Sequence, residues 1–572
     1  MNENLLEPLK YYEGQGKQQH RDNVEAHFQD LVKKSGVNVE ENRATMEKWK
    51  AEQQQISALS KIISRFKLYR TLLIVAIVVS AILALVSIAV FYNSLKLGAL
   101  LLGIGVVGIL LSAIVIAKKM NPVIKNTDSV RQEHIKKANA LESDGWEQMR
   151  ALNNLFSDKD AVRLIEKTLP GFAFEDNFST EQERLFLEKY DFYDMQTEDS
   201  SMLDTLAGQY AGNPFLFGRR RVHRMGTHTY VGSLLITWTE TYRDSEGRLR
   251  TRTRSQTLTA SVVKPKPYYD VNTFLAYGNQ SAPNLQFSRS SKHVENLSEK
   301  ALERKIKKGE QKLQKKAEKA IKNGGNFQEM ANAEFDVLFD ATNRTNEVEF
   351  RFMYTPLGQR NTVALLKDNK NYGDDFDFIK QGKCNVIISD HAQYWPMHIF
   401  AKEYAHFNFT EIQDRFISLN ENYFKSVFFD FAPLFSVPAY LDEPCASLDD
   451  VEPYDTNYTY YEHEVMANAL SDKSFLHEDS CTEAILKTKT LRSDNDNDVL
   501  SVTANSYTGI DRLDFIPTLG GDGKLHSVPV PWIEYVPVSK TTQIFVGNAS
   551  TKHEKATVSY HGMVAGIMDK KD

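Results

Sequence analysis

Two uncharged apolar runs constrain this chain more than any other feature: TLLIVAIVVSAILALVSIAVF at 71–91 and LGALLLGIGVVGILLSAIVIA at 97–117. Each run has about the 20 residues with which an α-helix crosses a hydrocarbon layer of about 30 Å. Only YNSLK separates them. The pair therefore predicts a tight transmembrane helical hairpin that enters and leaves on the same side. The alternative, two buried helices of a soluble core, fits poorly because uncharged runs of this length are rare outside membranes.

The composition of the runs and their flanks refines this prediction. Small residues recur at helical spacing and favour close packing: Ala76, Ser80, Ala84, Gly105, Gly108 and Ser112. Basic residues flank the outer ends of the hairpin, namely Lys61, Arg65, Lys67, Arg70, Lys118, Lys119 and Lys125. The turn between the runs holds only Lys96. Because Lys and Arg accumulate on the cytoplasmic side, we expect a multi-pass protein of the cell membrane with both termini in the cytoplasm.

Helical periodicity continues on both sides of the runs. Apolar residues recur at steps of three and four at Ile56, Leu59, Ile63 and Phe66, and after Val130 they recur at steps of three at Ile135, Ala138 and Leu141. We therefore expect an antiparallel helical stalk that extends the hairpin. An earlier helix around Val24, Phe28 and Leu31 would pack on this stalk or on the distal domain. Amphipathic helices lying on the membrane surface are the alternative.

From about residue 170 onward, alternating residues and turn signals predict β-structure. TYVGSLLITWTETYRDSEGRLRTRTRSQTLTASVVKP is typical of a β-hairpin with its turn at 244–247. On the returning strand Arg248, Arg250, Arg252 and Arg254 would share one face. This arginine ribbon could pair with phosphate groups, or it could be an exposed strand whose charge prevents edge-to-edge aggregation.

Two further basic stretches bear on that choice. RRRVHR places Arg219, Arg220 and Arg221 near the same hairpin. LERKIKKGEQKLQKKAEKAIKNGG predicts a basic helix over 297–323 with a narrow apolar seam at Leu302, Ile306, Leu313, Ala317 and Ile321. The candidate anion-binding residues are Arg219, Arg220, Arg221, Arg248, Arg250, Arg252, Arg254, Lys305, Lys308 and Lys312. A solvated, soluble helix face is the alternative for the lysines.

The middle of the chain predicts mixed elements. Phe335, Val337 and Phe339 alternate, as do Val348, Phe350 and Phe352, which predicts two strands. Thr355 and Pro356 are typical of a helix start, and CNVIISDHAQYW predicts a further strand. We therefore expect a membrane-anchored α+β protein: a two-helix transmembrane hairpin, a helical stalk and a mixed cytosolic domain rich in antiparallel hairpins. The expected divisions are 1–70 cytosolic helices, 71–117 hairpin, 118–168 stalk, 169–400 α+β domain and 401–572 C-terminal α+β region.

The order of these features resembles a bacterial membrane family of unknown function that often accompanies LemA-type proteins. The resemblance covers about 50–400 and rests on YRDSEGRLRTRTRS, NEVEFRFMYTPLGQRNTVALLKD and NVIISDHAQYW. It implies a membrane-anchored cytosolic domain without established catalytic residues. The chain departs from that family in its longer basic helix and in about 170 further C-terminal residues.

The C-terminal region adds a helix and a second hairpin. FTEIQDRFISLNENYFKSVFFDF contains Lys425 and Asp430 and predicts a core helix rather than a third span. SYTGIDRLDFIPTLGGDGKLHSVPVPWIEYVPVSK echoes the first hairpin and indicates an internal duplication. Pro529 and Pro531 suit an edge strand there.

Motifs for catalysis or metal binding are incomplete. YYEHEVMANAL has His463 and Glu464 but no second histidine one turn later, so it is not a zinc-protease helix. Asp494, Asp496 and Asp498 have calcium-loop spacing, but the required glycine and glutamate are missing, and we interpret the segment as an exposed loop. Three distant cysteines make no disulfide framework and indicate a reducing compartment. Cys384, beside Asp390 and His391, opens an apolar strand and is expected to be buried.

These observations favour a non-enzymatic membrane-anchored scaffold or adaptor without a cofactor or metal. The alternative is a membrane-tethered hydrolase whose carboxylates and histidines would come from Asp390, His391, His463 and Glu464. Binding of anionic lipid or nucleic acid through the basic residues ranks below both. Nucleic acid is disfavoured because acidic stretches dilute the positive field. We expect the membrane, a protein partner and a possible second copy of the chain as partners.

Overall fold

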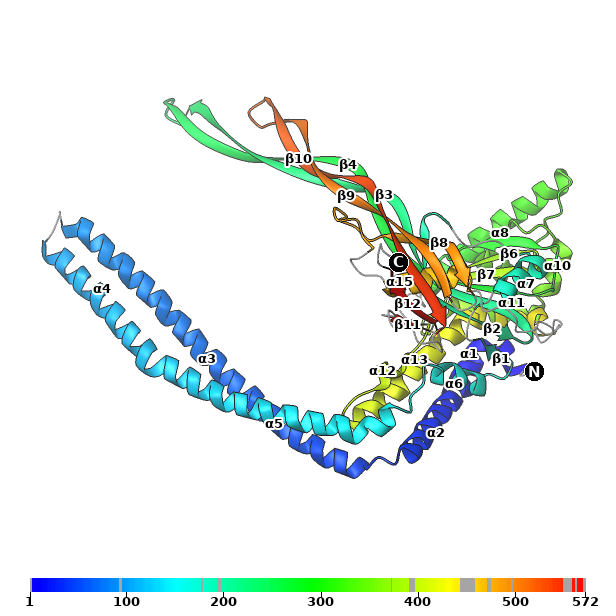
Figure 1. Cartoon of the computed structure of the whole chain (residues 1–572). Helices are drawn as coiled ribbons and strands as arrows, with labels where there is room; N and C mark the ends of the chain where they lie inside the picture. The colour runs from blue at the N-terminus through cyan, green and yellow to red at the C-terminus, as the bar shows by residue number, and fades with distance from the viewer. Residues whose placement is uncertain are drawn as a thin grey trace. The chain divides into compact units, whose positions relative to one another are not determined.

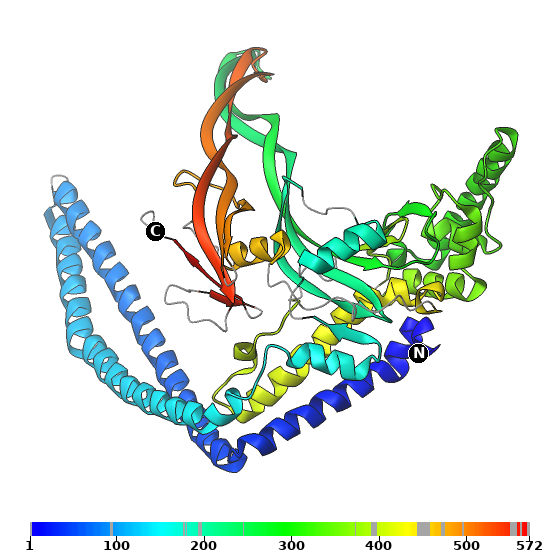
Figure 2. The same cartoon turned by 45° about the vertical axis from the view of Figure 1, so that its right-hand side comes forward.

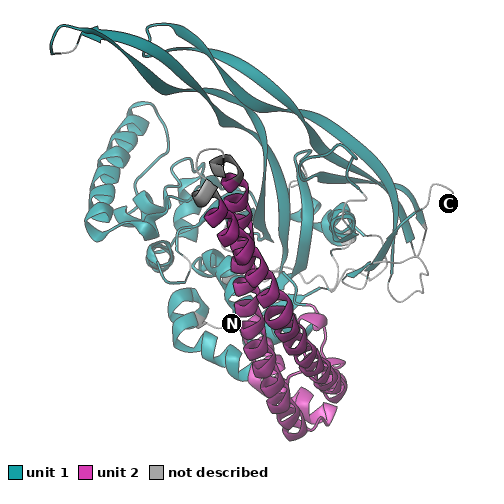
Figure 3. Cartoon of the chain, turned by 90° about the vertical axis from the view of Figure 1, so that its left-hand side faces the viewer, with its two compact units in different colours: residues 1–23, 159–399, 420–572 teal, residues 24–158, 400–419 magenta. Residues whose placement is uncertain are grey.

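The computed structural model describes residues 3–91, 95–175, 178, 180–192, 197–243, 245–371, 373–389, 397–442, 458–470, 475–494, 497–548, 558–560 and 563–568. The chain divides into two compact units (Figure 3). The helical unit comprises 24–158 and 400–419. The α+β unit comprises 1–23, 159–399 and 420–572, so it contains residues from both sides of the division expected at 400.

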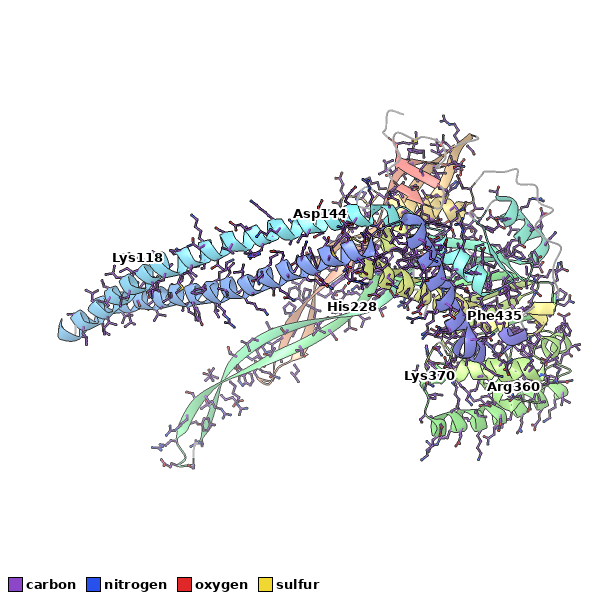
Figure 4. All side chains as sticks on the ribbon, turned by 90° about the horizontal axis from the view of Figure 1, so that it is seen from below. Lys118, Asp144, His228, Arg360, Lys370 and Phe435 are labelled. Atoms are coloured by element: carbon purple, nitrogen blue, oxygen red, sulfur yellow. The ribbon has the colours of Figure 1, made fainter. Side chains whose placement is uncertain are left out.

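A long helical hairpin forms most of the helical unit (Figure 1). Helix α3 (Val39–Phe91) runs outward, and α4 (Leu95–Val115), η3 (Ile116–Met120) and α5 (Asn121–Asn153) return beside it. Lys118 and Asp144 mark this returning segment in Figure 4. Two described helices are long and apolar enough to cross a membrane. Large side chains on them, such as Leu85 and Leu111, are 67% and 59% exposed, as expected of a surface that faces lipid.

Small residues allow α3 and α4 to approach closely. A Cβ added to Gly105 would lie 2.8 Å from the Ser80 carbonyl oxygen and 3.0 Å from the Ala84 Cβ. One added to Gly108 would lie 2.6 Å from the Ser80 hydroxyl. The small-residue packing predicted from the spacing is confirmed at these four positions.

The other end of the hairpin holds a segment from much later in the chain. The Asn42 amide donates a hydrogen bond to the Phe407 carbonyl at 2.9 Å, and its oxygen accepts one from the Phe409 backbone N–H at 3.0 Å. Gly145 leaves room for this segment, because a Cβ there would lie 2.9 Å from the Phe407 oxygen. Phe28, on α2 (Lys17–Ser35), packs on Phe409 at 5.8 Å. Contacts distant in sequence therefore close the base of the hairpin.

Two antiparallel sheets form the α+β unit. The seven-stranded sheet has the order β1-β2-β3-β4-β7-β6-β5, and the five-stranded sheet has the order β11-β12-β10-β9-β8. The strands of the first sheet are β1 (Phe172–Phe174), β2 (Ser200–Tyr210), β3 (Asn213–Arg243), β4 (Leu249–Gly278), β5 (Gln286–Arg289), β6 (Phe376–Gln381) and β7 (Cys384–Ser389). Those of the second are β8 (Ile485–Asp494), β9 (Asn497–Leu519), β10 (Leu525–Asn548), β11 (Val558–Tyr560) and β12 (Met563–Ile567). The α+β class with antiparallel hairpins is thus as the sequence predicts.

Helix α15 (Tyr460–Leu470) contributes to the cores of both sheets. Its Tyr461 and Val465 pack with Phe274 and other residues of the first sheet. Its Met466 and Ala467 pack on strands of the second sheet.

The remaining helices are η1 (Glu3–Leu6), α1 (Pro8–Tyr11), η2 (Tyr12–Gly16), α6 (Asp160–Thr168), α7 (Thr180–Tyr190), η4 (Val294–Asn296), α8 (Glu299–Lys322), α9 (Ala333–Phe339), α10 (Glu347–Met353), α11 (Pro356–Lys367), α12 (Ala401–Tyr404), α13 (Phe409–Phe435) and α14 (Ala439–Asp442).

The two strands predicted at 335–339 and 348–352 are wrong, because both segments are helical. Asn332 caps α9 by accepting the Phe335 N–H at 3.2 Å, and Asn346 caps α10 by accepting the Glu349 N–H at 3.1 Å. The buried Arg344 guanidinium between these helices donates to Asp336 at 2.6 Å. Alternating aromatic residues indicated a strand, but the asparagine caps and this buried charge pair favour helices.

Other predicted helices are confirmed. Helix α11 begins where the Thr355 hydroxyl accepts the Gly358 N–H at 3.3 Å. Helix α13 contains Pro433 and buries Phe428 and Phe431 completely, as expected of a core helix. The basic helix exists as α8, but its apolar seam is only partly covered: Leu313 is buried, whereas Ile321 is 77% exposed.

Candidate functional site

Two long hairpins of the α+β unit pack face to face and form its most extended feature (Figures 1 and 2). One consists of β3 and β4, the other of β9 and β10. We call residues 224–270 and 508–536 the hairpin arm. Gly247, the last residue of the predicted turn of the first hairpin, has a φ of 78°, and Asp244 lies outside the described residues. Both hairpins predicted from the sequence therefore exist, and they contact each other.

The packing between the hairpins is close and partly apolar. Ile236, Leu258 and Val528 form a small buried core. Charged and polar contacts surround this core. The Lys264 ammonium lies 2.7 Å from an Asp514 carboxylate oxygen and 4.1 Å from the centre of the Trp532 ring. These contacts fix one face of each hairpin and leave the other face of each exposed.

The arginine ribbon lies where the first hairpin continues beyond the second. The register pairs Arg250, Arg252 and Arg254 with Tyr242, Glu240 and Trp238. Alternation places these three arginines on one face, as predicted. Arg248 precedes β4 and pairs with Glu246. Glu240 partly neutralises the ribbon, because its carboxylate lies 2.6 Å from Arg254 and 3.7 Å from Arg252.

The second hairpin ends before the tip of the first. The turn of the second hairpin contacts Gln256 of the first hairpin, because the Gln256 side-chain oxygen accepts the Gly521 N–H at 2.7 Å. The segment 240–254 therefore extends past this turn (Figure 1). It holds five arginines against Glu240, Asp244 and Glu246. The tip carries a net positive charge on a surface that the second hairpin leaves uncovered.

Arg219, Arg220 and Arg221 have internal partners at the base of the first hairpin. Arg219 lies 3.5 Å from Asp204, and Arg220 donates to Asn272 at 3.0 Å. Arg221 lies 2.9 Å from Glu483. Arg219 and Arg220 connect β3 to the neighbouring strands β2 and β4, and Arg221 connects β3 to the segment before β8, which supports a structural role for them.

The basic residues of the sequence therefore lie at separate places in the unit. Arg221 pairs with Val271 and Arg250 with Tyr242, so about 20 residues of β3, roughly 65 Å of strand, separate the two groups. Lys305, Lys308 and Lys312 lie on α8, which packs on α9. The Lys305 ammonium donates to the Lys292 carbonyl at 3.5 Å. The candidate anion-binding residues therefore do not form one continuous surface along the first hairpin and α8.

The outward face of the second hairpin exposes an apolar surface that the sequence analysis missed. Leu513, Phe515, Leu519 and Leu525 are 52%, 61%, 65% and 70% exposed. The register places Leu519 opposite Leu525, Phe515 opposite Pro529 and Leu513 opposite Pro531. We call these six residues the outer apolar face. The spacing of Leu513, Phe515 and Leu519 at odd positions of one strand was a signal for it, but only packing shows which face stays uncovered.

The interior of the unit holds the carboxylates and histidine considered for catalysis. His463 is buried, and its Nε2 lies 2.9 Å from an Asp498 carboxylate oxygen. The Ser493 hydroxyl donates to the other Asp498 oxygen at 2.5 Å. The serine and the histidine both contact the aspartate, so the histidine does not lie between them as a general base must. The arrangement links α15 to β8 and β9.

The two glutamates of α15 bind backbone groups. Glu464 accepts the Met202 N–H at 2.9 Å, at the point where the β2–β3 register shifts, and lies 2.6 Å from the Lys487 ammonium. Glu462 accepts the Phe178 N–H at 2.7 Å. Burial raises the pKa of Glu462 to about 8. Glu464 thus satisfies the backbone at the irregular point of β2, and Glu462 satisfies the backbone at Phe178, which lies before α7.

Cys384 is the other candidate that lies among the described residues. Cys384 is buried as predicted, and burial raises the pKa of its thiol to about 12, which disfavours the reactive thiolate. Asp390, His391 and Asp496 lie outside the described residues. Among the residues that the structure describes, no group of three His, Cys, Asp or Glu side chains could hold a metal ion.

No protein-family model, curated protein or solved structure matches this chain. The resemblance to a LemA-associated membrane family stays a prediction.

Proposed function

We propose that the protein is a non-enzymatic membrane-anchored scaffold whose hairpin arm binds a protein partner at the inner face of the membrane. The outer apolar face is the observation that carries this proposal. Exposed clusters of large apolar side chains on folded proteins commonly mark interaction sites. The aromatic ring of Phe515, 61% exposed, is the side-chain type that contributes most at the centre of interfaces.

The buried polar groups support a structural rather than a catalytic role. His463, Glu462 and Glu464 bind other parts of the unit and are at most 4% exposed. A catalytic acid or base has to reach a substrate, directly or through one water molecule. A tethered hydrolase would therefore need residues other than these three.

Site-specific photo-crosslinking in cells tests the scaffold proposal. A photo-reactive amino acid at Phe515 or Leu525 should give the same discrete protein adduct. The control position is Thr257, which lies on the outward face of the first hairpin and is exposed. Adducts of equal intensity at Thr257, or none at Phe515 and Leu525, would contradict the proposal.

The positively charged tip of the first hairpin, 240–254, supports a second candidate function, which is binding of an anionic membrane leaflet. Each basic residue near such a surface contributes about 1 kcal/mol, and Leu249 at the tip is 67% exposed. The full chain in lipid nanodiscs, with an environment-sensitive dye on L249C, should report an apolar environment with phosphatidylserine but not with phosphatidylcholine alone. High salt, or Arg250→Gln, Arg252→Gln and Arg254→Gln together, should abolish the difference. A signal insensitive to both would exclude electrostatic binding.

A further inference from the structure

A cavity of about 340 Å³ lies at the base of the hairpin arm, within the α+β unit. Its lining includes Glu198, Asp199, His223, Tyr269, Ser506 and Tyr507. These residues come from the segment before β2 and from strands β3, β4 and β9. The cavity thus forms only where the two hairpins meet.

His223 presents a buried nitrogen without a partner to this cavity. Its Nδ1 lies 3.1 Å from an Asp199 carboxylate oxygen, and its side chain is 10% exposed. Its Nε2 has no hydrogen-bond partner among the described residues. The carboxylate favours the tautomer with a proton on Nδ1, which leaves the Nε2 lone pair available as an acceptor. The centres of the Tyr269 and Tyr507 rings each lie 5.3 Å from the centre of the imidazole, so both rings pack against it in tilted orientations.

Ser506 adds a second buried polar atom. The residue is 2% exposed, and within the described part of the chain its hydroxyl has no hydrogen-bond partner. Buried polar groups without partners are rare in folded proteins because each costs desolvation energy. Two of them lining one cavity indicate a site that a ligand completes.

The charge of the lining defines the chemistry of that ligand. Glu198 and Asp199 supply two carboxylates, and the lining contains no lysine or arginine among the described residues. Arg221, whose charge acts on Tyr269, is itself paired with Glu483 at 2.9 Å. Tyrosine faces and carboxylates together favour organic cations. Imidazole Nε2 and the serine hydroxyl can each accept an N–H from such a group.

We propose that this cavity binds an organic ammonium or guanidinium group, with Nε2 of His223 and the Ser506 hydroxyl as acceptors and the Asp199 and Glu198 carboxylates as counter-charges. The group could be a lysine or arginine side chain of a protein or a free small amine. The proposal is independent of the scaffold role, because the outer apolar face lies on other residues of the arm.

Calorimetric titration of the full chain in detergent tests the site with defined probes. The probes are a blocked lysine dipeptide, a blocked arginine dipeptide, spermidine, and a blocked norleucine dipeptide as the uncharged control. At least one cationic probe should bind. The norleucine dipeptide should not bind, and neither should acetate and phosphate, which serve as anionic controls. Preference for the dipeptides over spermidine would identify a protein side chain as the source, and the reverse preference a free amine.

Variants of the lining give the matched comparison. His223→Phe keeps a ring against Tyr269 and Tyr507 but removes the acceptor, and it should weaken cation binding at least about tenfold. His223→Gln restores an acceptor and should recover part of the affinity. His228→Gln, on the same strand and exposed on the hairpin (Figure 4), should bind like the natural chain. Unchanged melting temperatures in these variants would show that the fold persists. No cation binding, preference for anions, or unchanged binding in His223→Phe would each overturn the proposal.

Discussion

The backbone of Gly232 lies directly against that of Pro529: a Cβ built on Gly232 would come within 1.9 Å of the Pro529 carbonyl oxygen. The two residues lie on different hairpins and are almost 300 positions apart in the sequence. This contact sets how closely the hairpins of the arm approach, because backbone atoms cannot move aside as a flexible side chain can.

Gly232→Val should separate the hairpins near this point. Overpacking of a close contact costs about 1–3 kcal/mol, and here the colliding atom is backbone. We expect faster amide hydrogen exchange over 510–532 and a lower melting temperature. Ser233→Ala, at the next residue with its side chain exposed, should leave both unchanged. Equal exchange in the two variants would mean that the hairpins do not depend on this contact.

Gly105→Leu should disrupt the packing of α3 on α4. Its Cβ would meet the Ser80 oxygen at 2.8 Å, whereas a Cβ on Gly103, two residues earlier on the same helix, would meet nothing within 4 Å. Membrane helices associate largely through such close packing. Disulfide formation between cysteines introduced into α3 and α4 should fall in Gly105→Leu and persist in Gly103→Leu. Equal disulfide yields would place the interface elsewhere.

Glu462 should make stability depend on pH. Burial raises its pKa from 4.5 to about 8, so between these values the unfolded chain releases a proton that the folded protein retains. The contribution of this group to stability therefore falls as pH rises from about 4.5 to about 8 and is constant above that. In urea denaturation, the free energy of unfolding should fall less between pH 5 and pH 8 in Glu462→Gln than in the natural chain.

The control for this change is Glu318→Gln, an exposed carboxylate on α8. It should keep the pH dependence of the natural chain. A Glu462→Gln variant with that same dependence would assign the effect to other groups.

The orientation of the helical hairpin of α3 and α4 in the membrane can be measured by labelling intact cells. Positive residues on the outer flanks predict that 92–96 reaches the far side of the membrane. Asn93→Cys should react with an impermeant thiol reagent from outside. Cys481 is exposed in the α+β unit and should react only after the cells are opened. Labelling of Cys481 in intact cells would reverse the orientation.

The sequence alone determined the elements whose pattern is local. Two apolar runs of membrane-spanning length specified the helical hairpin, since a helix satisfies its own backbone groups. Alternation with a period of two and a glycine turn specified the hairpin of β3 and β4 and placed Arg250, Arg252 and Arg254 on one face. Thr355 and Pro356 specified the start of α11, because the hydroxyl cap and the fixed proline φ act within one turn.

Only the tertiary structure decided what depends on distant contacts. Phe335 and Phe350 lie in helices because side-chain caps and the buried Arg344 outweigh a strand-like alternation. The register along β3 separates Arg221 from Arg250, although both belong to one hairpin. His223 and Ser506 line one cavity despite their separation in the chain. Periodicity describes one element at a time, whereas burial, register and cavities arise from packing between elements, which no local pattern contains.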